Sequence, residues 1–165
     1  MKVLRILILT AIVMLFYGVV EAGVTTYELL PGSSFEEGCV SPCMCPVAMH
    51  DDLVGTFALA KKRKSGQDTF YQIKDIFWKA VDPYGETVHA ITGAGIYHYQ
   101  NVGNHNVKHQ LTLDVKIDGG KPIHLDSGYT LGCSEFPAVA VSVRRGTQCF
   151  DIWMDIIAAS INQPK

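Results

Sequence analysis

The segment HQLTLDVKI, residues 109–117, decides the fold class of this chain because apolar and polar side chains alternate along it without interruption. The apolar positions are Leu111, Leu113, Val115 and Ile117, and the polar positions are Gln110, Thr112, Asp114 and Lys116. A period of two is typical of a β-strand that turns one face to a core and the other to solvent. The segment therefore predicts a half-buried strand.

Segments rich in Val, Ile, Thr, Phe and Tyr lie on both sides of this strand, and short turn signals separate them. The turn signals are KSGQD at 64–68, DPYGE at 82–86, NVGNHN at 101–106, DGGK at 118–121 and RRGT at 144–147. Further strands are expected near 24–30, 53–60, 69–79, 87–99, 138–145 and 148–158. Successive strands joined by tight turns predict an all-β fold, an antiparallel sandwich or barrel of about seven to nine strands.

The N-terminal segment has the three parts of a secretory signal. Lys2 and Arg5 precede an apolar run over residues 6–20, and small residues end it near Ala22. The run is shorter than the ~20 residues that span a bilayer, so cleavage is expected rather than anchoring. We therefore predict a signal peptide over 1–22 and a single secreted β domain over 23–165, secreted or periplasmic, with no stable membrane insertion after cleavage.

The charge balance excludes a nucleic-acid binder. The whole chain has a formal net charge of −2, and the predicted signal contains Lys2, Arg5 and Glu21. The remaining 143 residues therefore carry 12 basic and 15 acidic side chains, a net charge of −3. Proteins that bind duplexes need clustered excess cations, which this balance does not supply.

Five cysteines raise the question of a redox centre, a metal site or a set of disulfides. Cys39, Cys43 and Cys45 lie within seven residues in EEGCVSPCMCPVAMHDD, residues 36–52, whereas Cys133 and Cys149 come late. The spacing lacks the C-x-x-C of a catalytic dithiol. Zinc held by the three early cysteines and His50 is an alternative, although structural sites usually pair two knuckles.

Export favours disulfides, because cysteine pairs persist in oxidising compartments. We expect Cys39, Cys43 and Cys45 to act as staples, with Cys149 in the same framework. A bridge from Cys149 would clamp the early loop over the outside of the last strand. An odd number of cysteines leaves at least one unpaired, and we expect Cys133 to be the free thiol.

Several segments together resemble a group of uncharacterised secreted bacterial β-proteins. They are YELLPGSSFEEGCVSPCMCPV, LVGTFAL, ITGAGIYHY, LDSG, EFPAVAVSV and CFDIWMDIIA, which together cover about residues 27–158. The G-C-x-x-P-C-x-C-P loop is the most specific part of the resemblance. It implies an extracellular β-fold with Cys39, Cys43, Cys45 and Cys149 as its framework, and it implies no activity.

Other candidate sites are weak. His105 and His109 in GNHNVKH and His50 in MHDD are possible metal ligands, but a loop setting favours ordinary surface residues. Asp151 and Asp155 flank Trp153 and suggest a sugar platform, yet i and i+4 on a strand lie ~13 Å apart, too far for a glycosidase pair. The cations of KKRKS, residues 61–65, could grip an anionic polymer or a membrane surface.

The sequence favours a secreted, non-enzymatic β-module with a structural or adhesive role, with no catalytic residues, no cofactor and an unknown extracellular partner. One alternative is a carrier with an apolar ligand in a barrel cavity, which small residues such as Gly93, Ala94 and Gly95 would leave open. Another is a metal-binding or redox protein that uses the Cys39–Cys43–Cys45 loop.

Overall fold

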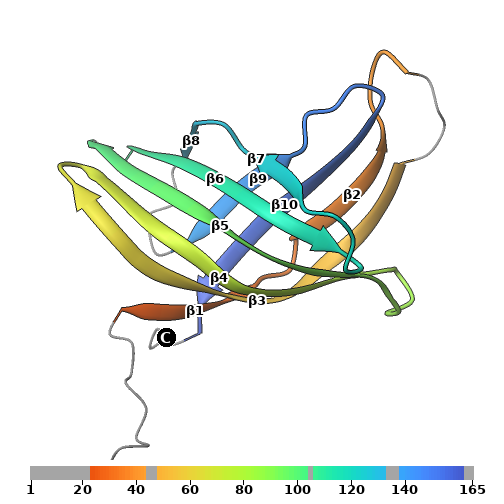
Figure 1. Ribbon diagram of the computed structural model, residues 1–165, viewed down its shortest axis with the longest axis horizontal. Helices are drawn as coiled ribbons and strands as arrows, with labels where there is room; N and C mark the ends of the chain where they lie inside the picture. Colours follow the sequence, from red (N-terminus) through yellow and green to blue (C-terminus); the bar gives the residue numbers. More distant parts are fainter. Residues whose placement is uncertain (1–22, 44–47, 104–105, 133–137, 162–165) are drawn as a thin grey trace, which may run out of the picture.

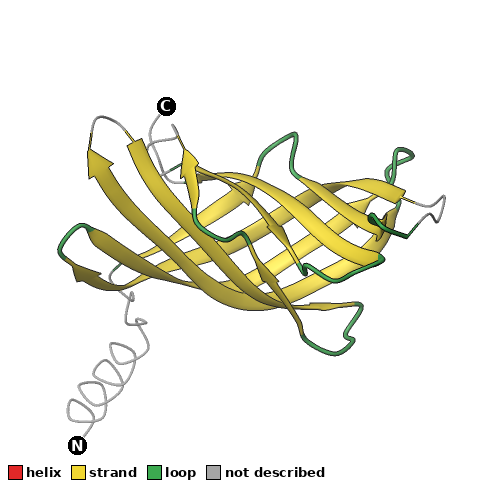
Figure 2. Ribbon diagram, turned by 90° about the horizontal axis from the view of Figure 1, so that it is seen from above, coloured by secondary structure: helices red, strands yellow, loops and turns green. Residues whose placement is uncertain are grey.

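The computed structural model describes residues 23–43, 48–103, 106–132 and 138–161, and in these ranges it contains β-strands and no helix (Figures 1 and 2). The strands are β1 (Val24–Leu29), β2 (Ser34–Cys39), β3 (Ala48–Ser65), β4 (Asp68–Val81), β5 (Thr87–Gly103), β6 (Asn106–Ile117), β7 (Ile123–Asp126), β8 (Thr130–Gly132), β9 (Val139–Arg144) and β10 (Phe150–Ser160). The predicted signal peptide, Cys45, His105 and Cys133 lie outside the described residues.

All ten strands belong to one antiparallel sheet that closes on itself. Consecutive strands pair from β2 to β7, and β9 pairs with β10. Closure comes from β1 and β2, which both pair with β10 on one side and β3 on the other. The all-β antiparallel prediction is therefore confirmed, and the ring-like closure makes the fold a barrel. Figure 2 shows the strands crossing the barrel obliquely.

The alternating segment that predicted the fold lies in β6. Leu111, Leu113 and Val115 are at most 1% exposed and form part of one continuous core. The last strand also follows the predicted alternation, because Ile152, Met154 and Ile156 are buried. Phe150 departs from it and is 49% exposed.

The early cysteine segment is more regular than the sequence suggested. Residues 34–39 form β2, and His50 to Asp52 belong to β3 rather than to a solvated loop. These two stretches pair with each other from Ser34↔Asp52 to Gly38↔Ala48. Asp51 turns inward beside Phe35 and is only 7% exposed, so the loop expectation was wrong for this carboxylate.

Gly93 and Gly95 allow a close approach between β5 and β6. A Cβ on Gly95 would lie 2.2 Å from the carbonyl oxygen of Thr112, and one on Gly93 would lie 2.4 Å from that of Asp114. The backbone of β6 therefore fills the space that small residues were expected to leave open. The core between Phe57, Ile73 and Trp78 is too small to hold a water molecule.

A disulfide joins Cys43 to Cys149, 106 residues apart in sequence. The predicted staple between the early cysteine segment and the last strand is thus confirmed, and such a bridge is typical of a non-reducing compartment. Cys39 is disulfide-bonded as well. No helix in the described part of the chain is long and apolar enough to cross a membrane.

Candidate functional site

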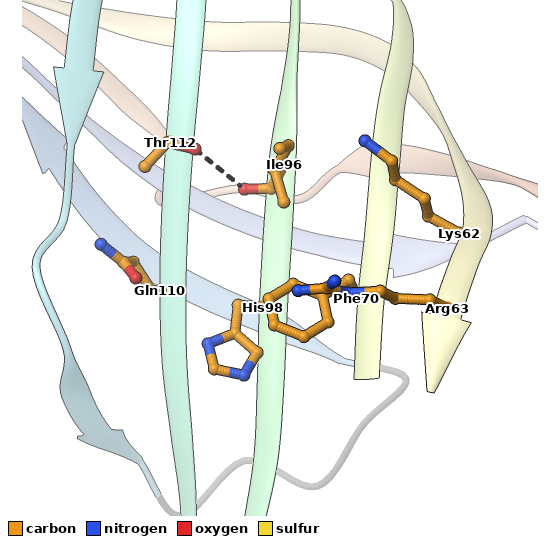
Figure 3. Close-up of a pocket in the computed structure, with 7 residues that line it drawn as sticks. All are labelled: Lys62, Arg63, Phe70, Ile96, His98, Gln110 and Thr112. Atoms are coloured by element: carbon orange, nitrogen blue, oxygen red, sulfur yellow. Dashed lines mark hydrogen bonds between the residues drawn. The ribbon is translucent and has the colours of Figure 1, made fainter. Parts of the chain in front are cut away.

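An outer groove crosses four neighbouring strands at the end of the barrel where β3 meets β4 (Figure 3). Its volume is about 390 Å³, and it is lined by Lys62 and Arg63 of β3, Phe70 of β4, Ile96 and His98 of β5, and Gln110 and Thr112 of β6. Figure 3 shows the two cations on one side and Gln110 with Thr112 on the other. We call it the cationic groove.

A β-bulge places both cations on the same side of the sheet. Consecutive residues of a regular strand point to opposite faces. The register between β3 and β4 shifts from Lys61↔Tyr71 to Arg63↔Phe70, which leaves Lys62 as the extra residue. Bulges re-aim side chains in this way. As a result, Lys62 and Arg63 both line the groove, although they are adjacent in sequence.

Aromatic contacts orient the guanidinium. Cζ of Arg63 lies 4.3 Å from the centre of the Phe70 ring, a cation–π distance. The Phe70 ring stacks in turn on the imidazole of His98, with centroids 4.3 Å apart and planes within 1° of parallel. Nε2 of His98 forms a hydrogen bond of 2.7 Å with Oδ1 of Asp68. The groove therefore has a supported rather than a freely rotating arginine.

The two cations have no carboxylate partner among the described residues. Within the ranges that the structure describes, neither Lys62 nor Arg63 forms an ion pair, and both are exposed. A planar guanidinium offers a fork of N–H donors that matches the paired oxygens of carboxylate, phosphate or sulfate. The groove can thus accept an anionic group at its cationic side, with the side chain of Ile96 offering an apolar surface beside it.

A second polar cluster lies inside the barrel toward the same end. The Tyr97 hydroxyl lies 2.5 Å from Nδ1 of His109, and the Tyr99 ring contacts the same imidazole edge-on. Burial raises the pKa of Tyr27 to about 12, with a smaller contribution from Tyr71, and it also raises the pKa of Tyr97. Burial lowers the pKa of His109. Tyr97 and His109 are therefore both uncharged near neutral pH.

The two proposed metal ligands that lie in the described ranges, His50 and His109, have other roles. His109 is only 1% exposed, so its interpretation as a surface residue was wrong. Nδ1 of His50 lies on the outside, 2.9 Å from Oε1 of Glu36. Nowhere in the described ranges do three or more His, Cys, Asp or Glu side chains gather closely enough to hold a metal ion.

Asp151 and Asp155 serve local hydrogen bonding. Oδ1 of Asp151 accepts the backbone N–H of Ile152 at 2.9 Å, and its Oδ2 accepts that of Gly146 at 3.2 Å. Its burial at 4% follows from this role in the turn before β10. Asp155 accepts the hydroxyl of Ser142 and, at 3.4 Å, that of Ser34.

A carboxylate–imidazole pair marks the opposite end of the barrel. Nδ1 of His89 lies 2.7 Å from Oδ2 of Asp118, and Nε2 lies 3.6 Å from Oε1 of Glu37. The pKa of the Asp118 carboxyl is lowered mainly by the hydrogen bond from the backbone N–H of Ala90. The hydrogen bond with the His89 side chain lowers it further. The pair fixes the start of β5 against the end of β6.

Sequence reasoning singled out Lys62 and Arg63 but missed Phe70, His98 and Asp68. The sequence did offer one signal for the aromatic contact, because Phe70 follows Arg63 across the turn predicted at 64–68. The stack depends on the register Phe70↔His98, which no sequence pattern supplied. Comparison with protein-family models, with curated proteins and with solved structures found no match to this chain.

Proposed function

We propose that this protein is a secreted, non-enzymatic β-module that adheres to anionic polymers outside the cell through the cationic groove. The observation that carries the proposal is the pair of cations Lys62 and Arg63, which a bulge aims into one groove and which form no ion pair with a described residue. Arg63 is already oriented on Phe70, so less side-chain freedom is lost when an anion binds.

A repeating polymer suits this geometry better than a small anion does. The groove is open and shallow on the outer face, and all residues from Lys61 to Gln67 are exposed. One exposed ion pair contributes only ~0–1 kcal/mol, so a single anionic group would bind weakly. Many linked anions raise the effective concentration at the groove and at neighbouring cations of the same hairpin.

Secretion is part of the proposal. The basic, apolar and small-residue pattern of residues 1–22 supports export, and the Cys43–Cys149 bridge agrees with an oxidising destination. N-terminal sequencing of the protein from its native host should give a chain that starts at Gly23. A chain that retains Met1 would contradict cleavage.

The binding test uses immobilised dextran sulfate, with neutral dextran as the reference surface. We expect saturable binding to the sulfated polymer alone. The binding should weaken strongly between about 0.01 M and about 1 M NaCl, because the screening length falls from about 30 Å to about 3 Å. Equal retention on both surfaces would contradict an anion site.

A matched pair of variants locates the site. The double substitution Lys62→Ala, Arg63→Ala should abolish most of the binding. The control variant, Lys79→Ala, Lys116→Ala, removes the same charge from exposed positions outside the groove and outside this hairpin, so it should retain most of the binding. If the two double variants lose binding equally, the effect is one of net charge and the groove is not the site.

A further inference from the structure

A second groove lies on the outer face of β7, β9 and β10, away from the two cations. Its volume is about 520 Å³, and it is lined by Val40, Asp126, Ser127, Thr130, Ser142, Val143, Arg144, Asp151, Trp153 and Asp155. One aromatic ring is thus surrounded by three hydroxyl side chains and by charges of both signs. We call it the tryptophan groove.

Strand register aligns the principal side chains in a row across the sheet. Trp153 pairs with Glu36 of β2 on one side and with Arg144 of β9 on the other. Arg144 pairs next with Asp126 of β7. Since neighbouring strands lie about 4.8 Å apart, this row of four residues crosses the barrel surface over about 14 Å.

The polar side chains beside Trp153 retain hydrogen-bonding capacity. Asp126 accepts the side-chain amide of Gln110 at 3.2 Å and the backbone N–H of Gly128 at 2.9 Å. Asp155 accepts two serine hydroxyls. These hydrogen bonds leave lone pairs on each carboxylate, which can accept further bonds. Arg144 is exposed and forms no ion pair with a described residue.

The lining favours an uncharged ligand that is rich in hydroxyl groups. Asp126 and Asp155 would repel an anion, and Arg144 would repel a cation. A sugar ring has an apolar C–H face that can stack on an indole, and its rim of hydroxyls both donates and accepts hydrogen bonds. Carboxylates and a guanidinium can each bond two such hydroxyls, which fixes the ring on the aromatic surface.

We propose that the tryptophan groove binds neutral saccharide chains, with Trp153 as the stacking platform and Asp126, Arg144 and Asp155 as hydroxyl partners. Asp151 is excluded from this set because its carboxylate is buried and occupied by the turn before β10. The two grooves meet at the Gln110–Asp126 hydrogen bond, but the saccharide proposal uses neither Lys62 nor Arg63, so either proposal can fail without the other.

Isothermal titration of the full mature chain with cellopentaose, maltopentaose and chitopentaose tests this assignment. We expect saturable binding of at least one of these neutral oligosaccharides. Trp153→Ala should weaken it about tenfold or more, as for other central aromatic contacts, and Arg144→Ala should weaken it as well. Tyr84→Ala removes an aromatic side chain that is 91% exposed in a distant turn, and it should leave binding unchanged.

Two further measurements distinguish loss of the binding site from loss of folding. Trp153→Phe keeps an aromatic platform and should retain measurable binding, and each variant should unfold at a temperature close to that of the parent protein. The variant Lys62→Ala, Arg63→Ala should bind the sugar normally. Absence of saturable heat with all three oligosaccharides, or equal affinity in the parent and Trp153→Ala, would overturn the proposal.

Discussion

The hydroxyl of Tyr97 and Nδ1 of His109 form a buried hydrogen bond across neighbouring strands β5 and β6. The other imidazole nitrogen, Nε2, has no hydrogen-bond partner among the described residues. Protonation of this ring would place a positive charge among buried aromatic side chains. Burial therefore lowers the pKa of His109 below its usual 6.5, which couples folding to pH.

The first prediction is a loss of stability in mild acid. Because the folded-state pKa lies below the unfolded value, the contribution of neutral His109 is complete above about pH 6.5 and declines as the pH falls below it. The slope contributed by one proton is at most about 1.4 kcal/mol per pH unit. Urea unfolding between about pH 7.5 and pH 5 should show a shallower decline in His109→Gln than in the parent protein. Identical slopes would exclude this residue as the cause.

The second prediction concerns the Cys43–Cys149 bridge. Its closed loop spans about 100 residues, for which the chain-entropy model gives about 4–5 kcal/mol. The double variant Cys43→Ser, Cys149→Ser should therefore lose about 2–5 kcal/mol of unfolding free energy, measured with denaturant without reductant. A loss below about 1 kcal/mol would mean that the bridge adds little to the constraint from β2 and β10 pairing.

The third prediction tests the close approach of β5 and β6. Gly95→Ala forces a Cβ to within 2.2 Å of the Thr112 carbonyl oxygen and 2.7 Å of the Leu113 side chain, so the strands must move apart. Overpacking of this kind costs about 1–3 kcal/mol. The control is Ala94→Val, since Ala94 is exposed on the outer face and should change stability by less than about 0.5 kcal/mol. Thermal unfolding followed by circular dichroism distinguishes the two, and equal midpoints would refute the close approach.

The fourth prediction concerns the turn before β10. Asp151→Ala leaves the N–H groups of buried Ile152 and exposed Gly146 without their carboxylate acceptor, and the unpaired buried N–H of Ile152 costs about 1–3 kcal/mol. Amide hydrogen exchange should accelerate at Gly146, Thr147 and Ile152 in this variant. Asp52→Ala, at an exposed position of β3, serves as the control and should leave those rates unchanged.

The sequence predicted strands well where one face meets the core and the other meets solvent. Leu111, Leu113 and Val115 show that case, whereas the apolar run around Phe77 and Trp78 did not indicate which face is buried. In the structure a bulge at Asp75, with φ of 53°, shifts the register so that Trp78 is buried and Phe77 is 65% exposed. Such a bulge depends on the partner strand, which the local pattern does not contain.

Residues 34–39 were not among the expected strands, and residues 49–52 were expected in a loop, for a related reason. Acidic side chains and glycine have low strand propensity, yet pairing with β10 and with each other makes these segments strands. The candidate sites follow the same logic. The cations at 62 and 63 were visible in the sequence, but Phe70, His98 and the row through Trp153 depend on registers between strands distant in the chain.

Barrel closure through β10 has a consequence for how the chain is made. Tyr27 of β1 pairs with Ser160 of β10. Strand β1 can therefore pair with β3 early, but it gains β10 as its second neighbour only after β10 has been translated. Until the ribosome has released β10, the nascent sheet exposes unpaired edges at β1, β2 and β9, and such edges template aggregation. Export before closure would let the chain complete its ring in the compartment where Cys43 and Cys149 can be oxidised. On this order of events, translocation comes first and barrel assembly follows.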